Sequence, residues 1–250
     1  MKKLLGISIQ KESNNEVLEQ IKRSLSLHNR FCHIVSLNPE NIVIAQIDEV
    51  FKKVIETAQI KIVDGIGVVL AAQILGIPIG ERLTGVDFMR RLIVLAKESR
   101  LTVLLIGGGP NLALSLAECY REQFPEAEFV GIEGYKNINK PTKKEENKVL
   151  SIVRSVKPNL IFAAFGSPEQ ELWLARHKKQ FKGIVCMGVG QGFDVEGSIV
   201  NRAPVWTQKI GFEWLYRLLI QPWRWKRQLR LIKFVWLVGK AKLDAVFFQK

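Results

Sequence analysis

Polar and charged residues follow several short apolar runs of this chain, where they could do chemistry. Asp64 comes directly after the strand-like run Ile60–Val63, and Gly65 and Gly67 follow it. A carboxylate presented at a strand end could accept a proton as a general base. The same position also suits a helix N-cap, because Asp is a preferred capping residue. Asn38, at the end of the preceding strand-like run, is ambiguous in the same way.

Glycines follow another strand-like run. Gly107 and Gly108 stand between Leu101–Ile106 and a helical pattern. Glycines there let backbone N–H groups approach a phosphate at a helix N-terminus. The full dinucleotide-binding spacing is absent, however, and no acidic residue follows at the distance that such a site requires. A tight turn without a ligand explains these glycines equally well.

The segment Gly166–Glu171 places a turn before a helix whose first residues are polar and acidic. We expect Ser167 at the N-cap and Pro168 at the first helical position. Capping explains Ser167, Pro168 and Glu169 and is indifferent to Gln170.

Two acids near the end of this region could form a cation site. In an extended segment, Asp194 and Glu196 would point to the same side. A carboxylate pair without a third ligand is more often solvated, so we predict neither a metal nor a cofactor.

Several arginines lie among glycines, aromatic residues and prolines. Bidentate guanidinium groups in such surroundings suit a diphosphate, although surface arginines are usually solvated. The candidates are Arg82, Arg202, Arg217, Arg224 and Arg227.

Residues 1–200 alternate between short apolar runs and longer amphipathic segments. The strand-like runs are Cys32–Leu37, Ile60–Val63, Leu101–Ile106, Glu128–Ile132, Leu160–Phe165 and Gly183–Val189. The helical patterns cover about 41–57, 66–75, 84–98, 110–123, 142–156 and 168–180. The basic, apolar start MKKLLGISI lacks a cleavage site and predicts one further strand. This alternation predicts an α/β fold with a parallel sheet and helices on both faces, whose ligand binds at the carboxyl ends of the strands.

The last fifty residues have a different composition. Residues 201–250 hold eleven Lys and Arg against Glu213 and Asp244, which gives +9 of the net charge of +13. They also contain every Trp except Trp173. Lys, Arg and Trp in alternation are typical of a surface that lies on anionic lipid. We expect two helices separated by Pro222, a domain boundary near residue 200, and a protein that lies on a bilayer without crossing it, since Lys233 interrupts the longest apolar run.

The overall composition, with 47% hydrophobic and 24% charged residues, is that of a globular protein and argues against disorder. Cys32, Cys119 and Cys186 are widely spaced. They predict buried thiols in a reducing compartment.

Taken in order along nearly the whole chain, these motifs resemble the WecG/TagA/CpsF family of bacterial glycosyltransferases. The motifs are Ser36-Leu-Asn38, Asp64-Gly65-Ile-Gly67, Glu81-Arg82-Leu-Thr84-Gly85-Val-Asp87, Gly107-Gly108, Gly134-Tyr135, Gly166-Ser-Pro-Glu-Gln170-Glu171, Gly188-Val-Gly190, Phe193-Asp194, Arg202-Ala-Pro204, Glu213-Trp-Leu-Tyr-Arg217 and Pro222-Trp-Arg224. The chain departs from the usual pattern at Ser36, where the family mostly has Thr, and at Glu169, where it mostly has a basic residue.

The resemblance implies a Rossmann-like core with a C-terminal helical appendage that docks on the membrane and completes the active site. It implies an inverting, metal-independent transfer of a sugar from a UDP-sugar to undecaprenyl-diphosphate-linked GlcNAc, in teichoic acid or other cell-surface polysaccharide synthesis. The donor would be UDP-N-acetylmannosamine, with UDP-glucose or UDP-N-acetylmannosaminuronic acid as alternatives. The protein would be peripheral, on the cytoplasmic face of the bacterial plasma membrane, and able to form homo-oligomers.

The resemblance also assigns roles to residues. Asp64 would be the general base, and Asn38, Arg82 and Gln170 would line the sugar and diphosphate pocket. Arg217, Arg224 and Arg227 would complete it from the appendage. The remaining motif residues assigned to substrate binding are Ser36, Asp87, Gly107, Gly108, Tyr135, Gly190 and Arg202.

Two other classes of protein compete with this interpretation. A Rossmann-like dehydrogenase would need the dinucleotide fingerprint that is missing here. A nucleic-acid-binding protein would suit the pI of about 9.8 and the basic, Trp-rich end. It would not explain the polar residues at the strand ends, so we predict no nucleic-acid partner.

Overall fold

A six-stranded parallel sheet forms the centre of the computed structural model, which describes residues 3–27, 30–200, 203–204, 207, 213–222 and 225–247. The strand order is β4-β3-β8-β7-β5-β6. The strands are β3 (Cys32–Leu37), β4 (Ile60–Val63), β5 (Thr102–Gly107), β6 (Glu128–Ile132), β7 (Leu160–Ala164) and β8 (Val185–Gly188). The predicted α/β class is thus confirmed, with each strand within two residues of its expected bounds.

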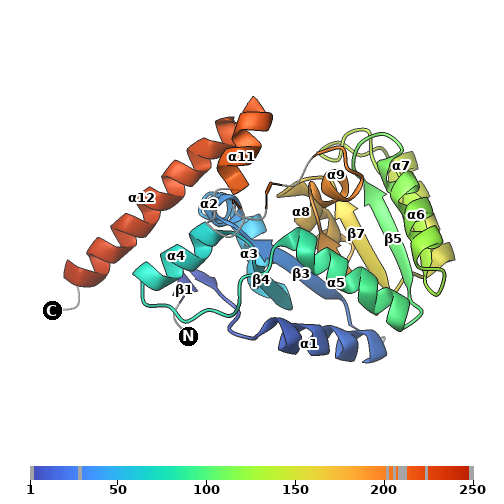
Figure 1. The fold of residues 1–250 in the computed structure, drawn as a ribbon, viewed down its shortest axis with the longest axis horizontal. Coiled ribbons are helices and arrows are strands. Elements are labelled where there is room, and N and C mark those ends of the chain that lie inside the picture. Colours follow the sequence, from blue (N-terminus) through green and yellow to red (C-terminus); the bar gives the residue numbers. More distant parts are fainter. Residues whose placement is uncertain are drawn as a thin grey trace.

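Helices cover both faces of the sheet (Figure 1). On one face lie α1 (Asn14–Leu27), α5 (Gly85–Glu98), α6 (Leu112–Gln123) and α9 (Gly192–Glu196), and on the other α2 (Pro39–Ala45), α3 (Glu49–Thr57), α4 (Ile66–Ile74), α7 (Lys143–Val156) and α8 (Glu169–Arg176). Alternate residues of a strand enter opposite clusters, as Phe162 and Ile161 do in β7. Because both faces are buried, the strands are predominantly apolar along their whole length, without regular alternation of polar and apolar residues.

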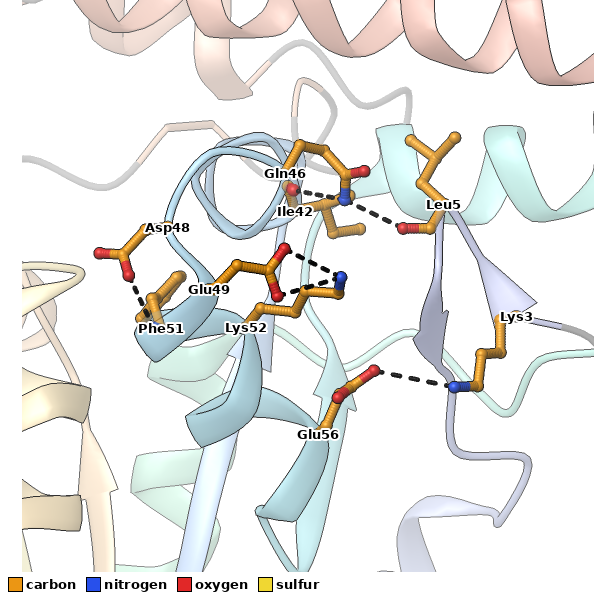
Figure 2. A network of polar contacts seen from close by, with 9 residues as sticks. All are labelled: Lys3, Leu5, Ile42, Gln46, Asp48, Glu49, Phe51, Lys52 and Glu56. Carbon is orange, nitrogen blue, oxygen red and sulfur yellow. Dashed lines mark hydrogen bonds and ion pairs between the residues drawn. The ribbon is translucent and has the colours of Figure 1, made fainter.

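The N-terminal segment forms a small hairpin instead of a single strand. β1 (Lys3–Leu4) pairs antiparallel with β2 (Ile7–Ser8), in a sheet separate from the main one. Figure 2 shows how polar contacts attach it to the neighbouring helices. Gln46 Nε2 donates to the backbone oxygen of Leu5 at 2.9 Å, and Lys3 Nζ lies 3.7 Å from Glu56 Oε1.

The predicted helices differ from the structure at several points. The pattern over 168–180 forms only α8, which ends at Arg176. The pattern over 41–57 forms two helices, α2 and α3, because Asp48 Oδ1 accepts from the backbone N–H of Phe51 at 2.9 Å and starts a new helix. The helix α1 was not predicted. Its first turn has a reciprocal cap, since Ser13 and Glu16 bond each other through backbone N–H and side-chain groups.

The C-terminal segment forms α11 (Glu213–Ile220) and α12 (Trp225–Phe247), with Pro222 between them as expected. α12 packs against α2 and α4 (Figure 1). Its Phe234 and Val238 are buried in the apolar cluster that these helices form. The first part of the predicted helix, from about residue 205 to 212, lies largely outside the described residues. Among the helices that the structure describes, none is both long and apolar enough to span a membrane.

The three cysteines are free thiols, and Cys32 and Cys186 are buried. Cys119 is exposed, so the prediction that all the thiols are buried is wrong for this residue. It lies on the outer side of α6, whose inner side carries the buried Leu116 and Tyr120.

Candidate active site

A cavity of about 360 Å³ opens at the carboxyl ends of the sheet strands. Residues after β3, β4, β5, β7 and β8 meet there, because parallel strands end at one edge of the sheet. The lining residues are Ser36, Asn38, Glu40, Asn41, Asp64, Thr84, Gly85, Val86, Gly108, Gly109, Ala164, Phe165, Gly166, Ser167, Gln170, Glu171, Gly188, Val189, Gly190, Gln191, Gly192 and Asp194. Six predicted site residues are among them: Ser36, Asn38, Asp64, Gly108, Gln170 and Gly190.

Asp64 is held in the cavity wall by its backbone. Its N–H donates to Leu37 O at 3.0 Å, and its carbonyl accepts from Arg82 Nε at 3.0 Å. The N-cap of α4 is Gly65, without a side-chain cap, so the capping alternative for Asp64 is wrong. The Asp64 carboxylate therefore does not cap α4.

The Ser36 hydroxyl and the Asp64 carboxylate border the same space. A methyl group built on Gly85 would lie 3.0 Å from Ser36 Oγ and 3.6 Å from Asp64 Oδ2. Within the described part of the chain, Ser36 Oγ is buried and has no hydrogen-bond partner. Gly85 thus keeps the space open between a hydroxyl and a carboxylate.

Asn38 combines two roles that the sequence left open. It caps α2, since its Oδ1 accepts from the backbone N–H of Asn41 at 2.9 Å, and it also lines the cavity. Asn41 in turn donates from Nδ2 to Ser36 O at 2.8 Å. These bonds fix the turn after β3 against the cavity.

Gln170 is buried between two strand-end turns. Its Oε1 accepts from the backbone N–H of Gly166 at 3.1 Å and of Gly190 at 3.0 Å. Gly188 must lack a side chain, because a Cβ there would lie 2.5 Å from Gln170 Nε2. The prediction of Ser167 as the N-cap of α8 is wrong by one residue, because Pro168 is the N-cap. Ser167 Oγ instead donates to Glu171 Oε2 at 2.6 Å.

Glu171 is a buried carboxyl group in the cavity wall. It is 1% exposed, and its Oε1 accepts from Gln170 Nε2 at 2.8 Å. Burial raises the pKa of this carboxyl from its ordinary value of 4.5 to about 7, although the bonds from Ser167 and Gln170 act in the opposite direction. Near neutral pH, the group therefore changes its charge.

This shift predicts a pH dependence of stability. Because the folded protein holds the Glu171 proton more tightly than the unfolded chain, the stabilisation is complete below pH 4.5 and is lost as the pH rises through about 7. In Glu171→Gln the group cannot titrate, so its free energy of unfolding relative to the natural protein should rise by on the order of 3 kcal/mol between about pH 5 and about pH 8. Urea unfolding of both proteins across this range measures the change. Parallel curves would contradict the prediction.

Four predicted site residues lie outside the cavity lining. Asp87 and Thr84 form a reciprocal cap at the start of α5. Thr84 Oγ1 donates to Asp87 Oδ2 at 2.6 Å, and the Asp87 backbone N–H donates to Thr84 Oγ1 at 3.2 Å. Arg82 donates to the Asp64 backbone from just beside the cavity. Gly107 packs against the ring of Phe165, which would lie 2.7 Å from a Cβ at this position.

Tyr135 is the fourth, and it belongs to an aromatic cluster with Phe165 and Trp173. Its hydroxyl accepts from Trp173 Nε1 at 2.9 Å. Burial raises the pKa of Tyr135 above its ordinary value, and a hydrogen bond to Glu146 adds to the shift. The substrate roles of these four residues remain predictions.

The C-terminal segment reaches the cavity at two points. Gln191, in the lining, donates from Nε2 to Gln221 Oε1 at 3.4 Å. Glu40, also in the lining, pairs with Arg230 of α12. Of the predicted arginines, Arg217 lies on α11 and Arg227 on α12, one turn before Arg230, whereas Arg202 and Arg224 lie outside the described residues.

The cavity lining is acidic. Its charged residues are Glu40, Asp64, Glu171 and Asp194, and the lining that the structure describes contains neither Lys nor Arg. A diphosphate would need compensating positive charge here. That charge has to come from residues beyond this lining.

The two acids that the sequence suggested as a cation site, Asp194 and Glu196, do not form a pair in the structure. Asp194 and Glu196 lie in the helix α9, not in an extended segment. Glu196 accepts from Arg90 Nε at 2.7 Å and from Tyr120 at 2.9 Å, whereas Asp194 lines the cavity. In the described part of the chain, no three His, Cys, Asp or Glu residues are grouped for a metal.

Sequence reasoning missed several lining residues, most clearly Glu40, Asn41 and Glu171. Glu40 and Asn41 stand two and three residues after Asn38, so the strand-end signal could have been extended to them. For Glu171 the only local signal was its position next to Gln170.

The sequence profile described as the glycosyl transferase WecG/TagA/CpsF family matches residues 2–246. The chain belongs to this family. It is therefore a glycosyltransferase, which decides against the dehydrogenase and nucleic-acid-binding alternatives as its principal activity.

Curated relatives support this assignment. Proteins named N-acetylglucosaminyldiphosphoundecaprenol N-acetyl-beta-D-mannosaminyltransferase, from Staphylococcus aureus strains NCTC 8325 / PS 47, COL and MRSA252, are each 30% identical to the chain over 245 residues. The match covers 96% of this chain and 92% of each relative.

Proposed function

We propose that this WecG/TagA/CpsF-family glycosyltransferase moves N-acetylmannosamine from a UDP-sugar to undecaprenyl-diphosphate-linked GlcNAc, with inversion and without a metal. The acceptor and the sugar are those in the names of the Staphylococcus aureus relatives. The product would serve teichoic acid or another cell-surface polysaccharide. UDP-glucose and UDP-N-acetylmannosaminuronic acid are the alternative donors.

The observation that carries the proposal is Asp64 in the cavity wall. An inverting transfer needs one base to take the proton from the acceptor hydroxyl while the diphosphate leaves. Asp64 presents a carboxylate beside the buried Ser36 hydroxyl, in space that Gly85 leaves open. Its backbone bonds to Leu37 and Arg82 hold this position.

Positive charge for the leaving diphosphate would come from the C-terminal segment. The acidic lining of the cavity makes this necessary, and the contacts of Gln221 and Arg230 with the lining bring the segment close enough. Arg217, Arg224 and Arg227 are the proposed donors of that charge, and Arg202 and Arg82 are further candidates. Residues 201–250 would thus form an appendage that completes the site of the core, residues 1–200.

The outer face of α12 suits a membrane surface. Phe234 and Val238 face the core, while an apolar stripe at helical spacing faces away from it. The stripe consists of Trp225, Leu229, Ile232, Trp236 and Leu243, each more than half exposed. The exposed Lys233 and Lys240 flank it, and such a helix binds in the plane of an anionic bilayer. We therefore propose a peripheral protein on the cytoplasmic face of the plasma membrane.

Release of UDP tests the proposed reaction. The protein is incubated with each of a panel of UDP-sugars, with and without a GlcNAc-diphosphate-lipid analogue, in the presence of EDTA. We expect release from UDP-N-acetylmannosamine that depends on the acceptor and persists in EDTA. If none of the UDP-sugars releases UDP, although the protein is folded and the acceptor is competent, the proposal is overturned. If UDP release stops in EDTA, the proposed metal independence is overturned.

A further inference from the structure

The side chains of Ser167 and Gln170 are both hydrogen-bonded to Glu171 in the cavity wall. Glu171 receives one bond on each carboxyl oxygen, from Gln170 Nε2 at 2.8 Å and Ser167 Oγ at 2.6 Å. Gln170 links Glu171 to the backbone, since its Oε1 accepts from the N–H groups of Gly166 and Gly190. Both glycine N–H groups belong to turns that line the cavity, after β7 and after β8.

The direction of these bonds matters. The oxygen of Gln170 must face the two backbone N–H groups, and its nitrogen must then face an acceptor. Glu171 is that acceptor, and it is 1% exposed, so no water replaces it. An amide rotated by a half-turn would set Nε2 against two N–H donors and leave both without a partner.

We propose that Glu171 is a positioning residue, whose carboxyl group fixes the orientation of the Gln170 amide and thereby ties the turns after β7 and β8 into one cavity wall. Gln170 is then chiefly an organiser of the site. Its Oε1 is occupied by Gly166 and Gly190 and one N–H by Glu171, which leaves one N–H for a ligand.

Amide hydrogen exchange, followed by NMR, tests the proposal without any substrate. Glu171→Met keeps most of the side-chain volume and removes both acceptor oxygens, so Gln170 Nε2 loses its partner. We expect the Gly166 and Gly190 amides to exchange at least about tenfold faster, while Leu104 in the centre of β5 keeps its protection. Glu169→Gln, which removes a charge from the same turn of α8 outside the network, is the matched control and should change neither glycine.

The result that overturns the proposal is unchanged protection of Gly166 and Gly190 in folded Glu171→Met. Ser167→Ala supplies a second variant, because it removes only the bond to Oε2 and should have a smaller effect on the same two amides. If Ser167→Ala has an effect equal to or larger than that of Glu171→Met, the hydroxyl and not the carboxyl group positions the turns, which also overturns the proposal.

A kinetic measurement, which rests on the proposed function, adds a readout that general destabilisation would not produce. A misplaced wall weakens binding of the substrate and the transition state alike, so KM for the donor should rise about tenfold with kcat within about threefold. A fall in kcat at unchanged KM would contradict positioning. If no UDP-sugar is turned over by the natural protein, the proposed function fails while the exchange experiment still decides the role of Glu171.

Discussion

Replacing Asp64 with asparagine is expected to lower kcat about 10³-fold and to leave the affinity for UDP within about threefold. Asparagine has nearly the same shape and cannot take a proton from the acceptor. The backbone contacts of residue 64 with Leu37 and Arg82 do not involve the carboxylate, so the wall should stay in place. Single-turnover kinetics and calorimetric titration with UDP measure the two quantities.

The control for Asp64→Asn is Asp48→Asn. Asp48 carries a carboxylate that caps α3 through Phe51, and asparagine is an equally good cap. This variant should keep both turnover and UDP binding. If Asp64→Asn loses both in equal measure, or keeps its turnover, Asp64 is not the base.

The second large effect is expected on the outer face of α12. Glutamate at both Ile232 and Trp236 removes two apolar side chains that are 67% and 61% exposed and adds two negative charges. Each buried side chain of this size contributes about 1.5–3 kcal/mol, so affinity for vesicles containing phosphatidylglycerol should fall at least about 100-fold. Co-sedimentation with vesicles measures the affinity.

Activity distinguishes membrane binding from damage to the site. The double variant should lose most of its activity on an acceptor embedded in vesicles and keep it on a soluble, short-chain analogue. Val94→Glu changes an apolar residue of α5 that is 47% exposed, away from α12, and should bind vesicles normally. Equal vesicle binding by the double variant and the natural protein would show that α12 is not the docking surface.

Deleting the segment from about residue 205 onward should also remove vesicle binding and activity together. The structure makes the point variants more informative, however. Because Phe234 and Val238 are buried against α2 and α4, truncation would expose part of the core as well as remove the proposed arginines.

Much of the core followed from local patterns. Strands such as Cys32–Leu37 and Ile60–Val63 were predicted at their observed bounds, because strands buried on both faces are predominantly apolar. The helix α1 was missed, since it is largely polar and only Val17, Ile21 and Leu25 are buried. The break between α2 and α3 depended on one capping residue, Asp48, within an otherwise continuous helical pattern.

The site was predictable where a strand end presents a polar residue. Asn38, Asp64 and Gly108 follow three different strands and meet because the sheet is parallel. The network of Gln170 was not predictable, since its partner Gly190 is twenty residues away in sequence. The importance of Glu171 likewise depends on burial, which sequence spacing alone does not reveal.

The mass and the anomeric configuration of the product test the proposed transfer most directly. The protein is incubated with UDP-N-acetylmannosamine and a GlcNAc-diphosphate-lipid analogue, and the lipid product is analysed by mass spectrometry and NMR. We expect an acceptor heavier by one N-acetylhexosamine, joined by a β linkage, and no such product from Asp64→Asn. An unchanged acceptor with every UDP-sugar tested, or an α-linked product, would contradict it.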